Sequence, residues 1–285
     1  NVGKHSFFDF TFYTHQMIER ELGLINTTHK PKPVLKEMKN FADFIRNTNI
    51  DLPKPLEQGV CLLTKGQDQW GAAYMSYCLA KAVGLNLKFS YAMDQELPES
   101  DLYLIPSPSG QMPFSKQFYD KLKEKVYNGA DVYISADKVF LEDFEAFTGL
   151  KVIDSYSFAE NRIVTLEGEE IPFYRTFTKK YSVSTAKVIA TDDSGNPSIT
   201  VNSYGKGNVY LVDAPIELNM TNVHNAFNGK FEKIYKVIFK KHLEKLPLSI
   251  DAKDVVYTLN EDEQSTYFIA VNHSETEKEL NLNLK

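Results

Sequence analysis

The sequence lacks the features that mark several broad classes of protein. It holds only two cysteines and one tryptophan in 285 residues, and its acidic residues outnumber the basic ones by 38 to 32. A net charge of −6 leaves no basic excess for nucleic acid, so we predict no nucleic-acid partner. No apolar run approaches the roughly 20 residues of a membrane-spanning helix, so we predict no membrane partner. No secretory signal is visible, and the chain begins without methionine, so its localisation stays open between cytoplasmic and secreted.

The scarcity of cysteine also limits the chemistry that we expect. Cys61 falls in an apolar stretch typical of a buried strand, and Cys78 falls in the apolar part of a helix. We therefore predict two buried, unreactive thiols rather than a disulfide or a catalytic cysteine. The six histidines lie far apart, without the spacing of metal ligands. The sequence thus predicts no metal site, and we expect no cofactor.

Residues 59–149 alternate between apolar strands and amphipathic helices. Short apolar runs predict four strands, at residues 59–64, 87–93, 101–105 and 130–136. Three helices are predicted between and after them, at residues 68–83, 114–128 and 139–147. Strands that alternate with helices pair in parallel, because crossovers of this length return the chain in the same direction. The predicted fold class is α/β, with an open, doubly wound, flavodoxin-like sheet.

The segments on either side of this unit have other patterns. Residues 1–50 offer one aromatic strand at 6–13 and one helix at 33–45, which cannot bury both of their apolar faces alone. Pro53 and Pro55 indicate a linker. Further strands are predicted at residues 162–166, 172–177, 186–190, 198–203 and 208–213, then a helix at 231–246 and three last strands at 255–259, 265–272 and 280–284. Those last three are too few for a stable sandwich.

Three stretches carry a resemblance to a known group of enzymes. Residues 19–25 (ERELGLI), followed by residues 29–33 (HKPKP), resemble the segment that closes the (β/α)8 barrel of clan A glycoside hydrolases, including β-galactosidases and cellulase/mannanase-like families. Residues 204–218 resemble the last strand of the class I glutamine amidotransferase-like domain that follows the barrel in several of these enzymes. Residues 267–274 resemble a turn of their C-terminal β-sandwich.

The resemblance implies a division of the chain into parts. Residues 1–50 are the last strand and helix of the barrel, and residues 51–58 are a linker. Residues 59–247 are an amidotransferase-like domain, and residues 248–285 are part of a β-sandwich. The two catalytic glutamates of such barrels follow strands four and seven, so the resemblance implies no catalytic residue in this chain.

The same resemblance gives the candidate site residues. Asp9 lines a sugar subsite at the barrel mouth, or it is a solvated residue at a strand end. Glu19 and Glu21, with Lys32 and Pro33, match the closing motif, and their expected role is structural. A carbohydrate substrate is expected only through the full-length enzyme. Because the aromatic strand and the helix at 33–45 leave apolar surface open, we also expect self-association into a homo-oligomer.

Few residues of the sequence are candidates for amidotransferase or hydrolase chemistry. An amidotransferase needs a cysteine at a strand-to-helix elbow, and the elbow expected after residues 130–136 carries Ser135 instead. Ser135 is either a substitute nucleophile or, as we favour, an ordinary strand-end serine. Gly205 and Gly207 indicate a hairpin turn rather than a phosphate loop. Asp213 and Glu217 either stand at the carboxyl end of the sheet, where ligands bind, or, as we favour, form a structural turn.

Two functions remain in view. The first is an accessory, non-catalytic C-terminal region of a glycoside hydrolase that supports the barrel and subunit contacts. The second is a stand-alone α/β protein that binds or hydrolyses a ligand at the carboxyl edge of its sheet, around residues 65–69, residues 107–110 and Asp137. The upstream coding sequence would discriminate them, since the first function needs seven more βα units.

Overall fold

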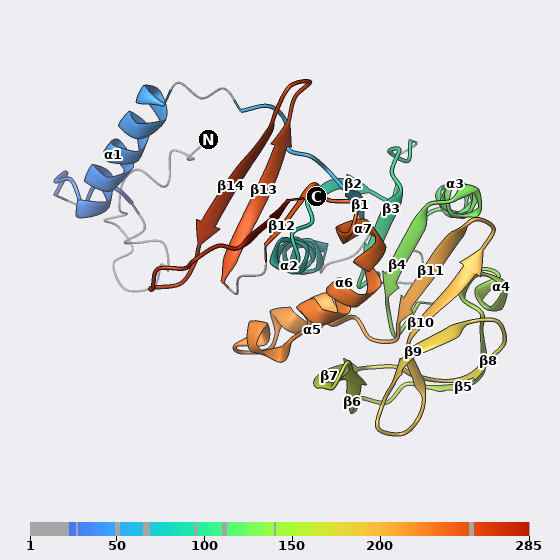
Figure 1. The fold of residues 1–285 in the computed structure, drawn as a ribbon. Coiled ribbons are helices and arrows are strands. Elements are labelled where there is room, and N and C mark those ends of the chain that lie inside the picture. Colours follow the sequence, from blue (N-terminus) through green and yellow to red (C-terminus); the bar gives the residue numbers. More distant parts are fainter. Residues whose placement is uncertain are drawn as a thin grey trace. The chain divides into compact units, whose positions relative to one another are not determined.

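The computed structural model describes residues 23–26, 28–48, 52–64, 69–93, 96–109, 113–139, 141–250 and 254–284. The chain divides into two compact units, Asn1–Leu52 and Pro53–Lys285 (Figure 1). The predicted strand at residues 6–13 lies outside the described residues, and so do Asp9, Glu19 and Glu21.

The described part of the first unit is built on α1 (Pro33–Asn47). Pro33 opens the helix, where its missing N–H costs no hydrogen bond and its fixed φ suits a helix. Before it, the Asn26 side chain accepts hydrogen bonds from the backbone of Thr28 and Lys30, which forms a tight turn. Within the described residues no side chain of α1 is buried. Its large apolar side chains stay exposed, namely Val34, Met38, Phe41, Phe44 and Ile45.

The second unit is built on a seven-stranded, mostly parallel sheet (Figure 1). Its strands lie in the order β2-β1-β3-β4-β11-β10-β9. The first five are parallel to one another, β10 runs antiparallel to β11, and β9 at the edge runs antiparallel to β10. Their bounds are Gly59–Leu63 (β1), Leu87–Tyr91 (β2), Leu102–Pro106 (β3), Asp131–Ser135 (β4), Lys187–Thr191 (β9), Pro197–Tyr204 (β10) and Gly207–Val212 (β11). The predicted α/β class, with parallel pairing of its strands, is confirmed.

Helices cover both faces of this sheet, which explains why β3 and β4 are buried along their whole length. One face is covered by α2 (Gln69–Ala82), α5 (Ile216–Thr221) and α6 (Glu232–Ile238), which share a core with Leu104 and Val212. The other face is covered by α3 (Lys116–Asn128) and α4 (Phe144–Thr148), which pack on Ile105 and Ile134. Continuous apolar runs are the sequence pattern of strands buried on both sides.

Two predicted helices differ from the structure. The helix expected over residues 139–147 is wrong, because α4 is the only helix among the described residues of this stretch and Asp143 takes a left-handed φ of 53° just before it. The helix expected over residues 231–246 is two short helices, α6 and α7 (Lys240–Leu243), with Phe239 between them. Ile234 and Ile238 are buried as predicted.

Four two-stranded sheets surround the central one. They pair β5 (Leu150–Tyr156) with β8 (Thr178–Val183), β6 (Glu160–Leu166) with β7 (Glu169–Arg175), β12 (Leu248–Ile250) with β15 (Leu282–Leu284), and β13 (Val255–Glu261) with β14 (Thr266–Asn272). The sequence patterns did not predict β5, β8 or β12. The ammonium group of Lys81 on α2 bonds to the Tyr257 carbonyl and the Thr258 hydroxyl, so α2 holds the β13–β14 hairpin.

Both cysteines are free thiols. Cys61 is fully buried on β1, and burial raises its pKa well above the ordinary value. Cys78 on α2 is only half-buried, which differs from the prediction, although burial raises its pKa too. The raised pKa disfavours the thiolate form that a nucleophile needs.

The hairpin predicted around Gly205 and Gly207 is confirmed, since β10 and β11 pair antiparallel and meet at Tyr204 and Gly207. Gly205 has a φ of +62°, a left-handed conformation that glycine adopts without strain. Gly207 lies against the end of α3, where a Cβ would overlap the carbonyl oxygens of Ala130 and Val126.

Gly207→Ala is therefore expected to lower the free energy of unfolding by about 3 kcal/mol, because the new methyl group meets rigid backbone. Gly168→Ala is the matched control. It also lies in a hairpin turn, and its positive φ costs about 1 kcal/mol, but no atom lies within 4 Å of its new Cβ. Guanidinium unfolding of both variants measures the difference. Equal losses would mean that the hairpin does not pack tightly on α3.

Candidate functional site

The carboxyl ends of the parallel strands bring four polar residues to one edge of the central sheet. Ser107 follows β3, Ser135 ends β4, Asp213 follows β11, and Glu217 lies in the first turn of α5. All four are at most 5% exposed. Ligands of doubly wound proteins bind outside this edge, which makes it the candidate site. Asp213 and Glu217 do stand at this edge, and their contacts decide between a ligand site and a structural turn.

Ser107 has the backbone of a strand-to-turn elbow. Its φ is +46°, a left-handed value that strains a residue with a side chain. Its N–H donates to Oγ of Ser135 at 2.8 Å, and its own Oγ donates to Oε2 of Glu217 at 2.8 Å. The elbow therefore follows β3 and not β4. The expectation that placed it at Ser135 is wrong, because Ser135 is the last residue of a regular strand.

Glu217 is the centre of this group. Tyr133 donates to its Oε1 at 2.6 Å and Tyr235 at 2.9 Å, while Ser135 donates to Oε2. Burial, and then the carboxylate charge, raise the pKa of both tyrosines well above the ordinary value, so both stay protonated donors. Both oxygens of Glu217 are thus filled by hydroxyl groups of the protein itself.

This group is poorly suited to nucleophilic catalysis. Ser107 is 5% exposed, and its hydroxyl also accepts a hydrogen bond from the Leu218 N–H at 3.1 Å. A hydrolase elbow uses the N–H of the next residue to stabilise an oxyanion, but the next residue here is Pro108, which has none. The Ser107–Glu217 group is therefore closed and internally bonded, which is the arrangement of a structural polar cluster.

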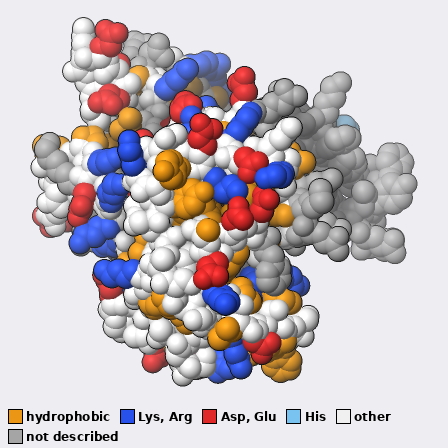
Figure 2. Space-filling model, turned by 90° about the vertical axis from the view of Figure 1, so that its right-hand side faces the viewer, with side chains coloured by type: hydrophobic (Ala, Val, Ile, Leu, Met, Phe, Trp, Pro, Cys, Tyr) orange, Lys and Arg blue, Asp and Glu red, His pale blue; other side chains and the backbone are white. Residues whose placement is uncertain are grey.

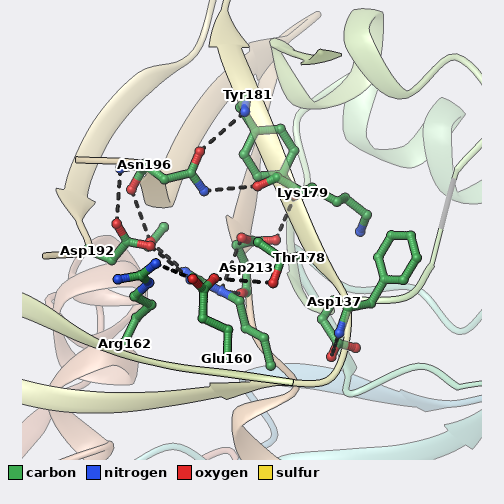
Figure 3. Close-up of polar contacts among 12 residues, drawn as sticks. Asp137, Glu160, Arg162, Thr178, Lys179, Tyr181, Asp192, Asn196 and Asp213 are labelled. Carbon is green, nitrogen blue, oxygen red and sulfur yellow. Dashed lines mark hydrogen bonds and ion pairs between the residues drawn. The ribbon is translucent and has the colours of Figure 1, made fainter. Parts of the chain in front are cut away.

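A second buried cluster lies beside it, where the central sheet meets two of the small sheets (Figure 3). Arg175, at the end of β7, donates from Nη1 to Asp192 and from Nη2 to Ser198, each at 2.8 Å. Its Nε donates to the Asp213 carbonyl at 2.6 Å and lies 3.3 Å from the Asp213 carboxylate. Tyr181 on β8 donates to that carboxylate at 2.6 Å.

Hydrogen bonds from backbone N–H groups hold two carboxylates of this cluster in place. Asp192 accepts the N–H groups of Ser194 and Asn196 in a tight turn after β9, while its other oxygen faces Arg175. Asp137, after β4, accepts the N–H groups of Thr176 and Phe177 and so fixes the connection between β7 and β8. We call Asp137, Arg175, Lys179, Tyr181, Asp192 and Asp213 the three-sheet junction.

The charges of the junction act on one another. Burial raises the pKa of Asp213 to about 7, although Arg175 and Lys179 oppose that shift. Burial works against ionisation of Asp192 too, but hydrogen bonds from Ser194 and Arg175 hold its pKa below the ordinary value. Burial lowers the pKa of Lys179, whose Nζ donates to the Val139 carbonyl at 3.3 Å.

The other candidate residues lie elsewhere. Lys32 and Pro33 stand at the start of α1, in the first unit. Among the described residues no group of three or more potential ligands is placed to hold a metal ion. Nor does any helix in that part of the chain have the length and apolar character to cross a membrane.

A separate shallow groove lies between the β2–β3 connection and α3. Three lysines and three glutamates share its lining: Lys88, Lys121, Lys125, Glu96, Glu99 and Glu124. This balanced charge indicates no preference for an ion of either sign. Figure 2 shows the same mixture on one face of the molecule, where basic and acidic side chains alternate around small apolar patches.

Comparisons with known proteins find similarity of fold but not of sequence. No family model matches the chain, and no curated protein matches it. Among solved structures, a β-galactosidase from Rahnella sp. R3 matches 88% of this chain with a TM-score of 0.65 and 15% identity. A β-galactosidase from Bacillus circulans sp. alkalophilus matches 94% with a TM-score of 0.63 and 12% identity. An exo-β-1,4-mannosidase from Opitutaceae bacterium strain TAV5 matches 80% with a TM-score of 0.59 and 18% identity.

The chain spans less than half of each of these structures, namely 41%, 43% and 44% of their lengths. Identities this low establish a common fold and no more. The chain therefore has the fold of a part of these glycoside hydrolase structures.

Proposed function

We propose that the chain is an accessory, non-catalytic region of a clan A glycoside hydrolase, which acts on O-glycosidic bonds of carbohydrates only as part of the whole enzyme. In this proposal residues 1–50 close the barrel and residues 51–58 are a linker. Residues 59–247 form an amidotransferase-like domain, and residues 248–285 form part of a β-sandwich. The work of the region is to support the barrel and contacts between subunits.

The observation that carries the proposal is the closed carboxyl edge. Ser107 takes the elbow conformation, yet its hydroxyl is turned inward to Glu217 and the following Pro108 offers no oxyanion donor. In other proteins of this fold the carboxyl edge holds catalytic residues. In this chain the same edge holds buried side chains that hydrogen-bond to one another. The match to 94% of this chain but 43% of a β-galactosidase supports the placement within a longer enzyme.

The bare apolar side of α1 also supports it. A helix with Met38, Phe41 and Ile45 exposed needs an apolar neighbour, and the last helix of a barrel has such neighbours in the helices on either side. In the proposal these neighbours belong to the barrel of the whole enzyme. Glu19, Glu21, Lys32 and Pro33 keep their structural roles, and Asp9 remains the candidate for a sugar contact.

The rival function is a stand-alone hydrolytic or ligand-binding protein, and the strained φ of Ser107 is the observation that favours it. Strain of this kind is found at active sites. The burial of the same side chain speaks against the rival, because a nucleophile must reach its substrate.

The purified chain is expected to hydrolyse aryl β-galactosides and β-mannosides no faster than buffer, since in this proposal the carboxylate pair that cleavage needs lies in the barrel outside the chain. Release of nitrophenol over hours measures this. The control is the same chain joined to its upstream coding region, which should turn over at least one of these substrates. Turnover by the chain alone that is lost in Glu217→Gln would overturn the proposal and favour the rival.

A further inference from the structure

The three-sheet junction contains more carboxylates than cations. Arg175 of β7 and Lys179 of β8 face Asp213 after β11, Asp192 after β9 and Asp137 after β4. All five side chains belong to residues that are at most 5% exposed, so water screens their charges little. With every group ionised, the junction carries one uncompensated negative charge. One added proton would balance it.

Asp213 is the member placed to take that proton. Its Oδ1 accepts the Tyr181 hydroxyl, and its Oδ2 lies 3.3 Å from Nε of Arg175 but accepts no hydrogen bond within the described part of the chain. Asp192 and Asp137 differ, because each accepts two or more N–H or hydroxyl hydrogen bonds that favour the charged form. A buried carboxylate oxygen without such donors is the cheapest site for protonation.

Asp213 also joins elements that lie far apart in the sequence. It touches Arg175 at the end of β7 and Tyr181 in β8, and it follows β11 of the central sheet directly. The contacts of Arg175, Tyr181 and Asp213 therefore connect the β5–β8 and β6–β7 sheets to the centre of the fold (Figure 3).

We propose that the charge state of Asp213 is a proton-dependent switch for this junction. With Asp213 neutral, Arg175 pairs with Asp192 alone and the charges balance, so β7 and β8 are held firmly. With Asp213 ionised, the excess negative charge loosens the attachment of β8 and of residues 175–178 to the central sheet. The switch acts on the outer sheets and needs no ligand.

The direction and range of the effect follow from the raised pKa of Asp213, about 7 in the folded chain against an ordinary 3.8. Between these two pH values the folded chain holds a proton that the unfolded chain has lost. The stability due to this proton is complete below about pH 4 and falls as pH rises towards 7. Tyr181, whose pKa burial raises well above its ordinary value, stays a donor throughout.

The test compares guanidinium unfolding at pH 5, 6, 7 and 8 for the wild type, Asp213→Asn and Asp193→Asn. Asp193 is the matched control. It follows Asp192 of the junction in the sequence, but its side chain is half-exposed and lies 3.7 Å from Arg162. The unfolding equilibrium constant of the wild type should rise with pH faster than that of Asp213→Asn, by up to about tenfold per pH unit below pH 7. Asp193→Asn should keep the wild-type slope.

Hydrogen exchange of the wild type tests the location and does not depend on the variant folding. After correction for intrinsic rates, protection of residues 178–183 relative to residues 102–106 should fall at least fivefold from pH 5 to pH 8. Parallel stability profiles of the wild type and Asp213→Asn would overturn the proposal. So would a constant protection ratio between the two segments.

Discussion

Arg175→Met is expected to lower the free energy of unfolding by about 3–5 kcal/mol, because it removes the cation that two buried carboxylates face. The guanidinium side chain is fully buried, and its N–H groups also serve Ser198 and the Asp213 carbonyl. Methionine fills much of the same volume but donates nothing. The expected loss of unfolding free energy therefore comes mostly from polar groups left without partners and less from lost packing.

Guanidinium unfolding at pH 8, where Asp213 is mostly ionised, gives the largest expected loss. The matched control is Arg162→Met on β6, whose side chain is 32% exposed and pairs with Glu160 beside solvent. Its loss should be smaller, because this pair is partly exposed and solvent screens it more than the fully buried pairs of Arg175. If both replacements cost the same, Arg175 is not what holds the small sheets to the central one.

The centre of the fold was predictable because local patterns decide it. Residues 102–106 and 132–134 are uncharged, mostly apolar runs, and such runs form strands buried on both faces. The end of α3 was equally predictable, because a glycine stands at the position where a helix commonly stops. In the structure this residue, Gly129, has a φ of +130°. Parallel pairing followed from the helices between the strands.

The small sheets were not predictable in the same way. β5 ends in a run of exposed residues from Asp154 to Tyr156, and its partner β8 begins more than twenty residues later. Neither strand shows a clean alternation of apolar and polar residues. Only their pairing with each other, across that separation in the sequence, identifies them as strands. The helix predicted from Val139 to Phe147 failed for a related reason. Its apolar spacing is helical, but Asp143 takes a left-handed conformation that ends any helix there.

The candidate site was predictable in position but not in character. Asp213 and Glu217 follow a predicted strand, so their place at the carboxyl edge was accessible from the sequence. Tyr133 looked like an ordinary residue of a buried strand, and Arg175 like an ordinary residue of the strand predicted at residues 172–177. What they bond to depends on contacts across 84 and 38 positions of the chain, which no local pattern encodes. The strained φ of Ser107 carries no sequence signal either.

These two clusters explain how the edge became closed. Each collects hydroxyl or cationic donors around a buried carboxylate, and each draws its donors from several elements. Tyr133 comes from β4, Tyr235 from α6 and Ser107 from the end of β3, so Glu217 joins the central sheet to the helices on one of its faces. Hydrogen bonds of this kind stabilise the fold. The loss of stability in a variant that lacks them therefore measures the structural role of the edge directly.

Glu217→Ala is expected to lower the free energy of unfolding by about 3–5 kcal/mol. It leaves buried hydroxyl groups of Tyr133 and Tyr235 without an acceptor and opens a cavity beside them. Glu217→Gln should cost less, because the amide oxygen still accepts from the tyrosines while its NH2 group faces the two serines. The order wild type, Gln, Ala is therefore expected in guanidinium unfolding.

The matched control is Glu124→Ala on the exposed side of α3, where the same replacement should change stability by about 0.5 kcal/mol or less. A structural Glu217 also predicts that stability and hydrogen-exchange protection of β4 fall together, since Tyr133 lies on that strand. If Glu217→Ala instead left stability unchanged, the fold would not depend on this carboxylate. A buried glutamate beside an elbow serine would then be the signature of a reacting group, and the stand-alone hydrolytic function would become the better account of this fold.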